Sequence, residues 1–412
     1  MILMGKNEKT KIVLSGLALA SPIGNDIPAF FNAIRNTKTA TAKITCMDSE
    51  KFSASVAAEV LKEKWNEELT DRDDRKNLFL NYTLEKLLND RKRELEKYIP
   101  ESRHLFLGTG IDFVNIPELL ERFTLSGNEY FDFIPYYRNT YDIAKNAASK
   151  YLILGSFTVN VATCIASAQA IGIGYLFLKE NPDNIAIVGG FDSMLNYPQY
   201  LGFQRLGPFS NWSGEPDKAC RPFDKNRSGM ILGEGAAVYT MQEARSADPE
   251  NILAEVKGYA SSMDGYLITD PEPSGSYLAR AALRAIKYAG LSPSDIDCVH
   301  LHGTGTLKND EAEANAMKLI FSEKFSEIPV FSLKGHIGHA IGACSALEVG
   351  AVIYSIKNQC VPITANFQKP DEKVPLNVIK GDEKNMRIQN VLKLNANIGG
   401  QNSALVIGKY EP

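Results

Sequence analysis

Strand-like apolar runs alternate with helix-patterned segments along the chain, and this alternation constrains the fold more than any other feature of the sequence. The clearest strands are predicted at residues 12–16, 105–108, 185–190, 236–240 and 299–302. The clearest helices, from the spacing of apolar side chains, are predicted at residues 166–179, 275–289 and 309–321. Strands that are apolar throughout are covered on both faces, so the pattern predicts an α/β fold with a buried, mostly parallel sheet.

The length and the net charge of the chain limit the number of domains and the kinds of partner that we expect. At about 150 residues per domain, 412 residues predict two or three domains or one two-lobed body. A composition shift near residues 247–249 suggests a boundary, so we assign an N-terminal half at 1–250 and a C-terminal half at 251–412. The formal net charge of -4 gives no reason to expect a nucleic acid or an anionic membrane as a partner.

The six cysteines include no C-x-x-C pair, are too sparse for a disulfide scaffold and favour a reducing cytoplasm. No apolar run reaches the roughly 18 to 20 residues that a membrane helix needs. Near the start, Lys9 and Lys11 precede the apolar run 12–20, a pattern typical of a short signal peptide or of a buried strand that ends in the turn at 21–24. The sparse thiols and the motifs further along the chain favour the strand.

Cys164 is a candidate nucleophile. It lies where an extended run gives way to a helix of small residues, and a thiol at a helix N-terminus loses pKa in the positive end of the helix dipole. The competing interpretation is a buried structural cysteine, which is commoner for an arbitrary free thiol. Small neighbours would let a substrate approach closely and keep the nucleophile interpretation open: Ala162, Ala166, Ser167 and Ala168.

Four of the five histidines form two close pairs, His300 with His302 and His336 with His339. Such pairs can share one face of a strand or helix and bind a metal, but glycines surround both and no carboxylate has the usual ligand spacing, so we predict no metal site. The alternative is that one histidine from each pair serves an acyl-transfer site around a cysteine, by activating the nucleophile or by donating hydrogen bonds to developing negative charge. The other two, His300 and His336, would then be structural.

Five ordered motifs carry a family resemblance that runs from residue 12 to residue 408. They are residues 162–172 around Cys164, 221–229, 233–236, 302–310, and 334–348 around His339. Together they resemble the β-ketoacyl-acyl carrier protein synthases of the elongating (KAS I/II) type and the related type II polyketide ketosynthases. The resemblance implies the thiolase fold, a five-layered α-β-α-β-α sandwich of two pseudo-repeated halves, normally in a dimer. It also implies an acyltransferase that forms carbon–carbon bonds in fatty acid or polyketide biosynthesis.

The resemblance implies a role for each matching residue. Cys164 would carry the growing acyl chain as a thioester, while His302 and His339 would hydrogen-bond the malonyl thioester carbonyl and stabilise the enolate formed on decarboxylation. The backbone N–H groups of Cys164 and Ile398 would hold the oxyanion of the condensation step. The charge of Lys334 would support the site.

The same resemblance implies several supporting positions. Glu348 would organise Lys334 and nearby water. Thr304 and Thr306 would hydrogen-bond the pantetheine amides, with simple capping of a glycine-rich turn as the rival interpretation for each. The substrates would arrive on the phosphopantetheine of an acyl carrier protein, and no other cofactor is implied.

A docking patch for the carrier protein is predicted in the charged segment near residue 75. Arg72, Arg75 and Lys76 lie where related enzymes place the cations that meet the acidic helix of an acyl carrier protein. Because aspartates interleave with these cations, a merely solvated surface is the rival interpretation. The active assembly would be a homodimer or a heterodimer with a chain-length-factor-like subunit.

The C-terminal glycine loop departs from the family pattern, which has two gating phenylalanines. In this chain Ala396 and Ile398 occupy those positions and would form a smaller acyl gate. Leu267 stands where many relatives have histidine, and Ser228 replaces a usual acidic residue. The smaller gate favours a specialised polyketide or polyene pathway over housekeeping fatty acid synthesis.

Two other functions are considered beside the ketosynthase. A chain-length-factor subunit shapes the pocket of an active partner without chemistry, but such subunits typically lack the cysteine that this chain has as Cys164. A thiolase uses a second cysteine near the C-terminal glycine loop, where this chain has glycines and Gln401. The set of Cys164, His302 and His339 therefore favours a ketosynthase that performs decarboxylative Claisen condensation with malonyl-acyl carrier protein.

Overall fold

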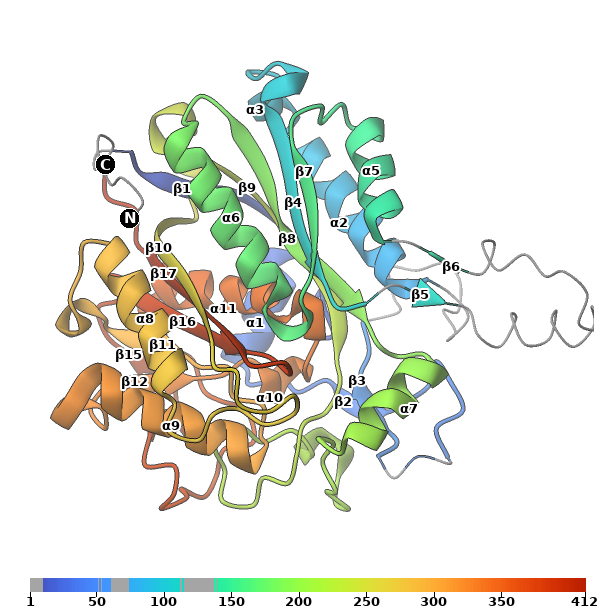
Figure 1. Cartoon of the computed structure of the whole chain (residues 1–412), viewed down its shortest axis with the longest axis vertical. Coiled ribbons are helices and arrows are strands. Elements are labelled where there is room, and N and C mark those ends of the chain that lie inside the picture. The colour runs from blue at the N-terminus through green and yellow to red at the C-terminus, as the bar shows by residue number, and fades with distance from the viewer. Residues whose placement is uncertain are drawn as a thin grey trace, which may run out of the picture.

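A mixed sheet of 11 strands organises the computed structural model of the chain, which describes residues 10–50, 52, 54–60, 74–111, 113–114, 137–138 and 140–412 (Figure 1). In spatial order the strands are β14 (Asn377–Val378), β12 (Pro329–Phe331), β11 (Cys298–His300), β16 (Asn390–Ala396), β17 (Gln401–Gly408), β10 (Ala254–Met263), β1 (Ile12–Ala20), β9 (Glu234–Glu243), β8 (Ile185–Ser193), β4 (Arg103–Thr109) and β7 (Phe157–Val161). All residues of β1, β8, β9 and β16 are buried, as expected for strands that helices cover on both faces.

The sheet consists of two halves with the same order of strand pairings. In the first half β1 pairs antiparallel with β9, β9 pairs antiparallel with β8, and β8 and β7 both lie parallel to β4. In the second half β10 pairs antiparallel with β17, β17 pairs antiparallel with β16, and β16 and β12 both lie parallel to β11. The halves join where β1 and β10 pair antiparallel. The boundary assigned after residue 250 falls between β9 and β10 and stays a prediction.

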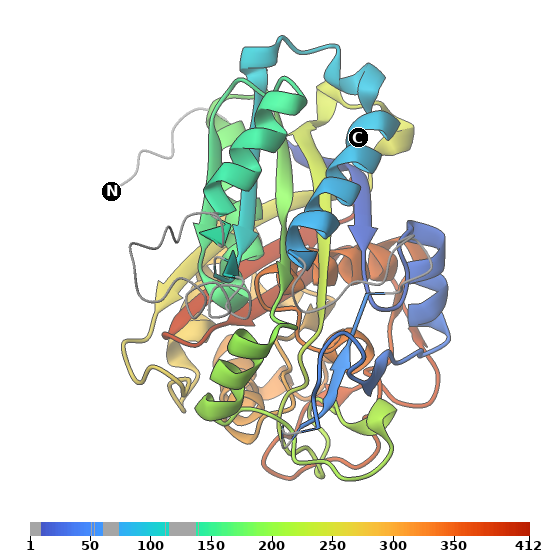
Figure 2. The same ribbon diagram turned by 90° about the vertical axis from the view of Figure 1, so that its right-hand side faces the viewer.

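Helices lie outside each half of the sheet and between the halves (Figures 1 and 2). On the first half, α2 (Arg75–Asp90) packs against β9 and α5 (Thr140–Lys150) against β7. In the middle, α6 (Ala166–Glu180) contacts β8 and β10, and α11 (Cys344–Asn358) contacts β9, β16 and α6. On the second half, α8 (Ser276–Tyr288) packs against β10 and β17, with α9 (Leu307–Phe321) beside it. This α-β-α-β-α order confirms the predicted five-layered architecture.

Shorter elements lie around these layers: α1 (Ile27–Arg35), α3 (Lys92–Leu95), α7 (Tyr197–Leu206), α10 (Lys334–Ile337), β2 (Thr41–Lys43), β3 (Val56–Ala58), β5 (Phe113–Val114), β6 (Tyr137–Arg138), β13 (Cys360–Val361) and β15 (Lys384–Asn385). The first of them, α1, begins after Asp26, whose carboxylate caps the helix by accepting from the N–H of Ala29 at 2.8 Å. Within the residues that the structure describes, no helix is both long enough and apolar enough to cross a membrane.

Small residues allow the central helix α6 to lie close to strands of both halves. A Cβ added at Gly172 would lie 2.3 Å from the ring of Tyr259 on β10, and one added at Gly174 would lie 2.5 Å from the side chain of Val188 on β8. Any larger residue at these two positions would push the helix away from one of the strands. The glycines therefore fix the depth of α6, and with it the position of the residues at its N-terminal end.

The predicted elements are present, but the direction of the strands is partly wrong. All five predicted strands and all three predicted helices occur, with ends shifted by a few residues. The expected mostly parallel sheet is wrong at its centre, where every pairing from β8 through β9, β1, β10 and β17 to β16 is antiparallel. A strand that is buried on both faces is apolar in either direction, so its composition does not report orientation. The run 12–20 is the buried strand β1, which confirms the strand interpretation.

The predicted carrier-protein docking patch is wrong for two of its three cations. Arg75 and Lys76 are only 4% and 2% exposed. The guanidinium of Arg75 donates to Glu234 at 2.8 Å, and the ammonium of Lys76 donates to the carbonyl of Ile111. Both cations lie on the inward face of α2, where Arg75 neutralises a buried carboxylate and Lys76 bonds to a backbone carbonyl, so they are not free to meet a partner. The third cation, Arg72, lies outside the described residues.

The buried Arg75–Glu234 pair generates a stability prediction. Arg75→Met leaves the fully buried carboxylate of Glu234 unpaired, and we expect the free energy of unfolding to fall by about 3 kcal/mol. In the double variant Arg75→Met/Glu234→Gln the loss should be smaller than the sum of the single losses, because no unpaired charge remains. Urea unfolding measures both values. The control is Lys97→Met in the exposed pair with Asp248, where the change should be much smaller, and an equal loss in both pairs would contradict the prediction.

Candidate active site

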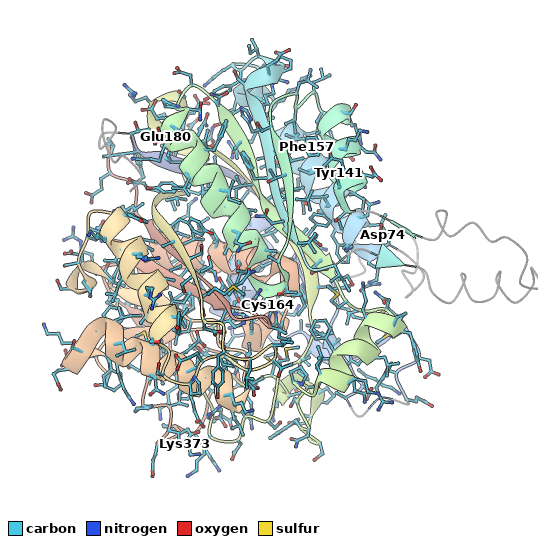
Figure 3. The ribbon with its side chains drawn as sticks, in the orientation of Figure 1. Asp74, Tyr141, Phe157, Cys164, Glu180 and Lys373 are labelled. Atoms are coloured by element: carbon cyan, nitrogen blue, oxygen red, sulfur yellow. The ribbon has the colours of Figure 1, made fainter. Side chains whose placement is uncertain are left out.

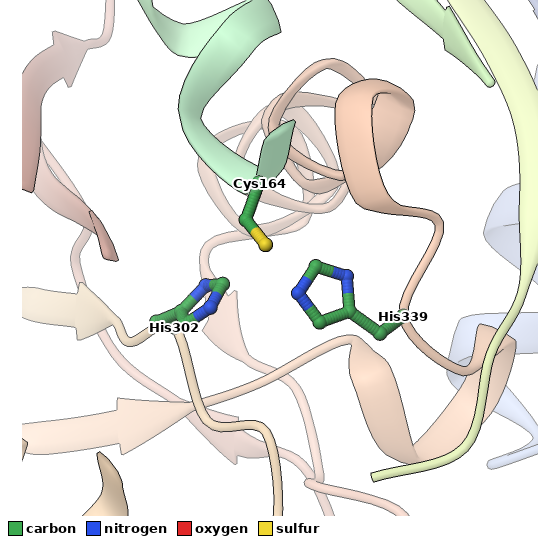
Figure 4. Close-up of side chains that lie close together, drawn as sticks. All are labelled: Cys164, His302 and His339. Carbon is green, nitrogen blue, oxygen red and sulfur yellow. The ribbon is translucent and has the colours of Figure 1, made fainter. Parts of the chain in front are cut away.

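Cys164, His302 and His339 lie together in a buried cluster. The sulfur of Cys164 and one ring nitrogen of each histidine all lie within 4.8 Å of one another, and the two rings are 5.1 Å apart at an interplanar angle of 81° (Figure 4). Cys164 belongs to the turn Thr163–Ile165 that precedes α6, near the centre of the molecule and at the opposite end of the helix from Glu180 (Figure 3). His302 follows β11 and His339 follows α10, so the first half contributes the thiol and the second half contributes both imidazoles.

Two strained backbone positions flank this cluster. Thr163, immediately before Cys164, has a φ of 47°, and Ile341, two residues after His339, has a φ of 41°. Both residues are β-branched, and a β-branched residue at positive φ is disfavoured unless its surroundings enforce it. Because the N–H of Ile341 donates to Nδ1 of His339 at 3.1 Å, the strained conformation also orients that imidazole.

The start of helix α11 holds the cysteine turn in place. The carbonyl of Cys164 accepts from the thiol of Cys344 at 3.1 Å and from the hydroxyl of Ser345 at 3.3 Å. The hydroxyl of Ser167 accepts from the N–H of Ala346 at 3.0 Å. Since α11 belongs to the second half of the chain, these bonds fix the thiol relative to the histidines.

The thiol of Cys164 is harder to ionise than the sequence predicts. Burial raises its pKa to about 11, while the charge of Lys334 and the backbone N–H groups of Ile398 and of Cys164 itself lower it. The prediction that the helix end lowers this pKa overall is therefore wrong, because desolvation outweighs the favourable dipoles. The same contacts show that the two N–H groups predicted to hold an oxyanion, those of Cys164 and Ile398, both face the sulfur.

The hydrogen bonds of the two imidazoles fix their tautomers. Nδ1 of His302 lies 3.2 Å from the ammonium of Lys334 and 3.2 Å from the amide nitrogen of Asn395, and both of these groups only donate. Nδ1 of His339 accepts from the backbone N–H of Ile341. Each Nδ1 is thus an acceptor, so each ring carries its hydrogen on Nε2. Burial, and next the charge of Lys334, hold the pKa of both histidines well below the usual range, so both rings are neutral N–H donors.

The same three side chains have the right composition for a metal site, but their tautomers do not fit one. A histidine that binds a metal through Nε2 carries its hydrogen on Nδ1 and donates it to an acceptor. Here the Nδ1 atoms of His302 and His339 already accept hydrogen bonds. If a metal bound Nε2, each Nδ1 would have to carry the hydrogen and would then face another hydrogen-bond donor. The donor set therefore suits an anion or a polarised carbonyl oxygen.

An ion network beneath His302 involves two residues that the sequence analysis missed. Lys334 donates to the backbone carbonyl of His302 at 2.6 Å and forms an ion pair with Glu348. The other oxygen of Glu348 accepts from Lys393 at 2.6 Å and from Asn395 at 3.0 Å. The missed residues are Lys393 and Asn395, and they could have been found, because a lysine inside an apolar strand needs a buried partner and its neighbour two residues on shares its face.

Two acids on α9 hold the loop that carries His302. Glu313 accepts from the backbone N–H groups of His302 at 2.5 Å and of Gly303 at 2.7 Å. Asp310 accepts from the N–H of Gly305 at 3.3 Å. Gly303 and Gly305 have φ values of 49° and 78°, which glycine adopts without strain, so the loop can turn back onto the helix. Glu313 was missed in the sequence, and burial raises its pKa to about 8.

Thr304 and Thr306 lie in the same loop and contact each other. Their hydroxyl oxygens are 2.9 Å apart, and the N–H of Thr306 donates to the hydroxyl of Thr304 at 3.3 Å. This local bond is the turn capping that was the rival interpretation of the pair. Thr304 is buried and Thr306 is partly exposed, so only the second reaches the surface in this conformation. Their pantetheine-binding role stays a prediction.

The two gate positions lie at the turn between β16 and β17. Ala396 ends β16, and Ile398 lies in the following loop. This loop is tied to two other segments, since Asn397 donates to the carbonyl of Ala162 at 3.0 Å and the N–H of Gly399 donates to the carbonyl of Ile268 at 2.7 Å. The loop therefore connects the cysteine turn to the exposed segment around Ile268.

The other two histidines bond to backbone groups. Nε2 of His300 accepts from the N–H of Leu333 at 3.3 Å, and the ring nitrogens of His336 lie 2.9 Å from the carbonyl of Lys38 and 3.1 Å from that of Ile363. The contact with Lys38 joins His336 to the first half of the chain, and the other contacts tie loops of the second half together, in agreement with the structural role predicted for both residues.

Comparison with known proteins gives the same family over almost the whole chain. Residues 9–247 match the family described as "Beta-ketoacyl synthase, N-terminal domain", and residues 253–368 match "Beta-ketoacyl synthase, C-terminal domain". The chain is 30% identical to the 3-oxoacyl-(acyl-carrier-protein) synthase 2 of Coxiella burnetii, with 98% of this chain and 99% of that protein covered. It is 26% identical to the tetracenomycin polyketide synthase ketoacyl synthase alpha subunit of Streptomyces glaucescens, with 98% and 99% covered.

A solved structure agrees with these relatives in fold. It is a type II polyketide synthase acyl carrier protein in complex with its ketosynthase bound to the hexaketide, and it matches with a TM-score of 0.87 and 27% identity over 98% of this chain and 100% of that chain. The thiolase-type architecture of the chain is thus that of this ketosynthase. The protein belongs to the β-ketoacyl synthase family, and it is an acyltransferase that forms carbon–carbon bonds.

The neutral histidines predict how stability depends on pH. Because the pKa of His302 and of His339 in the folded protein lies well below 6.5, the unfolded chain binds protons below about pH 6.5 that the folded protein does not bind. The contribution of these two histidines to the free energy of unfolding should therefore fall as the pH is lowered from about 7.5 to about 5.5, opposite in sign to the contribution of Glu313, whose pKa is raised to about 8. Urea unfolding of the wild type and of the His302→Gln/His339→Gln variant measures the slope. The variant should have the shallower slope, and equal slopes would contradict the neutral assignment.

Proposed function

We propose that the protein is a ketosynthase that condenses an acyl chain bound to Cys164 with a malonyl unit carried by an acyl carrier protein, with loss of carbon dioxide. The observation that carries the proposal is the cluster of the Cys164 thiol with two imidazoles whose Nε2 atoms carry hydrogen, all within 4.8 Å. A thiol supplies the nucleophile for acyl transfer, and paired N–H donors supply the stabilisation that an enolate oxygen needs.

The first half-reaction loads the chain. The sulfur of Cys164 attacks the thioester carbon of an acyl carrier protein, its proton leaves, and the carrier's thiol departs with a proton, so one thioester replaces another. The N–H groups of Cys164 and Ile398 face the sulfur and would donate to the oxyanion of this step. Donors that are already in place need no reorganisation when the charge forms.

The second half-reaction makes the carbon–carbon bond. The bond between the carboxylate and the α-carbon of the malonyl unit breaks, carbon dioxide leaves, and its electron pair forms an enolate whose oxygen accepts from Nε2–H of His302 and of His339. The enolate carbon then attacks the thioester on Cys164, and the sulfur leaves and is reprotonated. Two neutral donors suit this step because they stabilise the enolate without protonating it outright.

We also propose how the substrates are carried, how the enzyme is assembled and where it is located. The substrates come on the phosphopantetheine of a carrier protein, which the relatives named for acyl-carrier-protein substrates support, and no other cofactor takes part. The enzyme works as a homodimer or with a chain-length-factor-like subunit. None of the six cysteines, all of which lie among the described residues, forms a disulfide, and this supports a cytoplasmic location.

The pathway proposed is specialised polyketide or polyene synthesis, because the acyl gate is small. Ala396 and Ile398 replace the two phenylalanines of the family pattern, so a longer or bulkier chain could pass. A non-catalytic chain-length-factor role is less well supported, since the chain has the complete set of Cys164, His302 and His339. A thiolase role is also less well supported, because the loop after Ile398 has no cysteine.

Substitutions at the three central residues separate the two half-reactions. Cys164→Gln should abolish condensation but keep decarboxylation of malonyl-carrier protein, because both N–H donors of the histidines remain. His302→Ala and His339→Ala should each slow decarboxylation by about 10² to 10³-fold while Cys164 is still acylated. Intact-mass spectrometry after incubation with acyl- and malonyl-carrier proteins measures loading and carbon dioxide loss together. Full decarboxylation by either histidine variant would overturn the assigned roles.

The gate makes a separate prediction about chain selectivity. Ile398→Phe restores a large ring beside the thiol, and we expect it to slow acylation of Cys164 by long or rigid chains more than by short ones. The measurement is the loading rate for a series of acyl-carrier proteins of increasing chain length. Ile99→Phe is the control, because Ile99 is exposed and precedes the end of β4 that is remote from the cysteine turn. Unchanged selectivity in Ile398→Phe would contradict the gate and leave the ketosynthase chemistry standing.

A further inference from the structure

A second lysine, Lys393, contacts the carboxylate that supports the site, and none of the steps above uses it. Lys393 lies on β16 and is 1% exposed. Its ammonium donates to one oxygen of Glu348 at 2.6 Å and also to the side-chain oxygen of Asn395. The other oxygen of Glu348 forms the ion pair with Lys334. The carboxylate is thus shared between two buried ammonium groups.

This sharing sets the net charge of the closed site. Two lysines and one glutamate together carry one net positive charge, while His302 and His339 are neutral and the Cys164 thiol is neutral at rest. The nearby carboxyl of Glu313 adds no charge at neutral pH, because burial raises its pKa to about 8. A buried net charge is unfavourable unless an opposite charge forms close by. The opposite charges of the proposed reaction are the thiolate of Cys164 and the enolate, and both form within the same enclosed space.

We propose that Lys393 is a positioning residue of the condensation: by occupying one oxygen of Glu348, it leaves the charge of Lys334 uncompensated beside His302, and the site then favours the thiolate and the enolate. The inference rests on the proposed ketosynthase function for its meaning in catalysis. Without Lys393, Glu348 would neutralise Lys334 alone, and the site would have no net charge to offer a developing anion.

Lys334 and Asn395 connect Lys393 to the reacting atoms. Lys334 bonds to the carbonyl of His302 at 2.6 Å, and its charge is the largest effect opposing the burial that raises the pKa of Cys164. Asn395, which Lys393 also binds, lies 3.2 Å from Nδ1 of His302. The charges of Lys334 and Lys393 both lower the pKa of His302 and of His339, whereas that of Glu348 raises it. Each lysine therefore acts on the same groups in the same direction.

The test is the reactivity of the thiol in Lys393→Met, which keeps the length of the side chain and removes its charge. The rate constant for alkylation of Cys164 by iodoacetamide at about pH 8 should fall about tenfold, as for a rise of one unit in thiol pKa. Cys164→Ala gives the blank for other thiols. The matched control is Lys257→Met on β10 of the same sheet, whose ammonium donates to Asn390 at 2.8 Å and which should react at the wild-type rate.

A charge-restoring variant distinguishes electrostatics from packing. Lys393→Met/Glu348→Gln removes one positive and one negative charge, so Lys334 again provides the net charge, and alkylation should return most of the way to the wild-type rate. If Lys393 only filled space, the double variant would react no faster than the single one. Wild-type reactivity in Lys393→Met, or absence of recovery in the double variant, overturns the inference. Should Lys393→Met fail to fold by urea unfolding, Lys393→Gln gives the same comparison with the bond to Asn395 kept.

The same samples separate this inference from the proposed function. Decarboxylation of malonyl-carrier protein by the wild type tests the ketosynthase chemistry and does not involve Lys393 variants. If the wild type decarboxylates and the alkylation rates are insensitive to Lys393, the inference fails and the function stands. If the alkylation rates change as expected and the wild type does not decarboxylate, the electrostatic role stands and the function fails.

Discussion

The buried ion pair between Lys334 and Glu348 is the interaction on which the rest of the site depends. A lysine that is 1% exposed requires a partner, and Glu348 in turn requires a helix that brings a carboxylate into the centre of the molecule. α11 supplies it, and its other residues from Cys344 to Ile356 are buried on every side. Once the pair is in place, the ammonium of Lys334 donates to the backbone carbonyl of His302 and faces Nδ1 of its imidazole. The second contact determines the tautomer of the ring. The tautomer and the neutral state of the His302 imidazole thus depend on the charge of Lys334.

The middle layer of the fold explains why the site needs both halves of the chain. α6 brings the thiol from the first half, and α11 brings Cys344 and Ser345 to the carbonyl of Cys164 from the second. The two glycines on α6 set how deeply it lies, so the thiol and the imidazoles meet at a distance fixed by backbone packing. The repeated order of strand pairings places equivalent helices on either side of this contact. The site therefore exists only where the two halves meet, since neither half contains all three side chains.

The motifs in the sequence predict which residues form the site better than they predict the burial and the pKa of those residues. The five motifs were enough to identify Cys164, His302 and His339, because each stands at a fixed place among glycines and small residues. Strand direction was not predictable from apolar runs, and the burial of Arg75 was hidden because a charged segment gives no sign of which face turns inward. The pKa of Cys164 was predicted in the wrong direction, since a sequence shows the helix end but not the desolvation around it.

The raised pKa of the thiol is compatible with nucleophilic catalysis when the timing of charge is considered. If the thiolate were already stable in the free enzyme, the site would stabilise the ground state as well as the transition state. The barrier of the reaction would then fall little. In the proposed reaction the donors that face the sulfur, the N–H groups of Cys164 and Ile398, would also donate to the oxyanion of an attacked thioester. Burial keeps the resting thiol neutral, and the positive charge at Lys334 acts on whichever anion forms next. The arrangement therefore stabilises negative charge along the reaction more than before it, which is the condition for lowering a barrier.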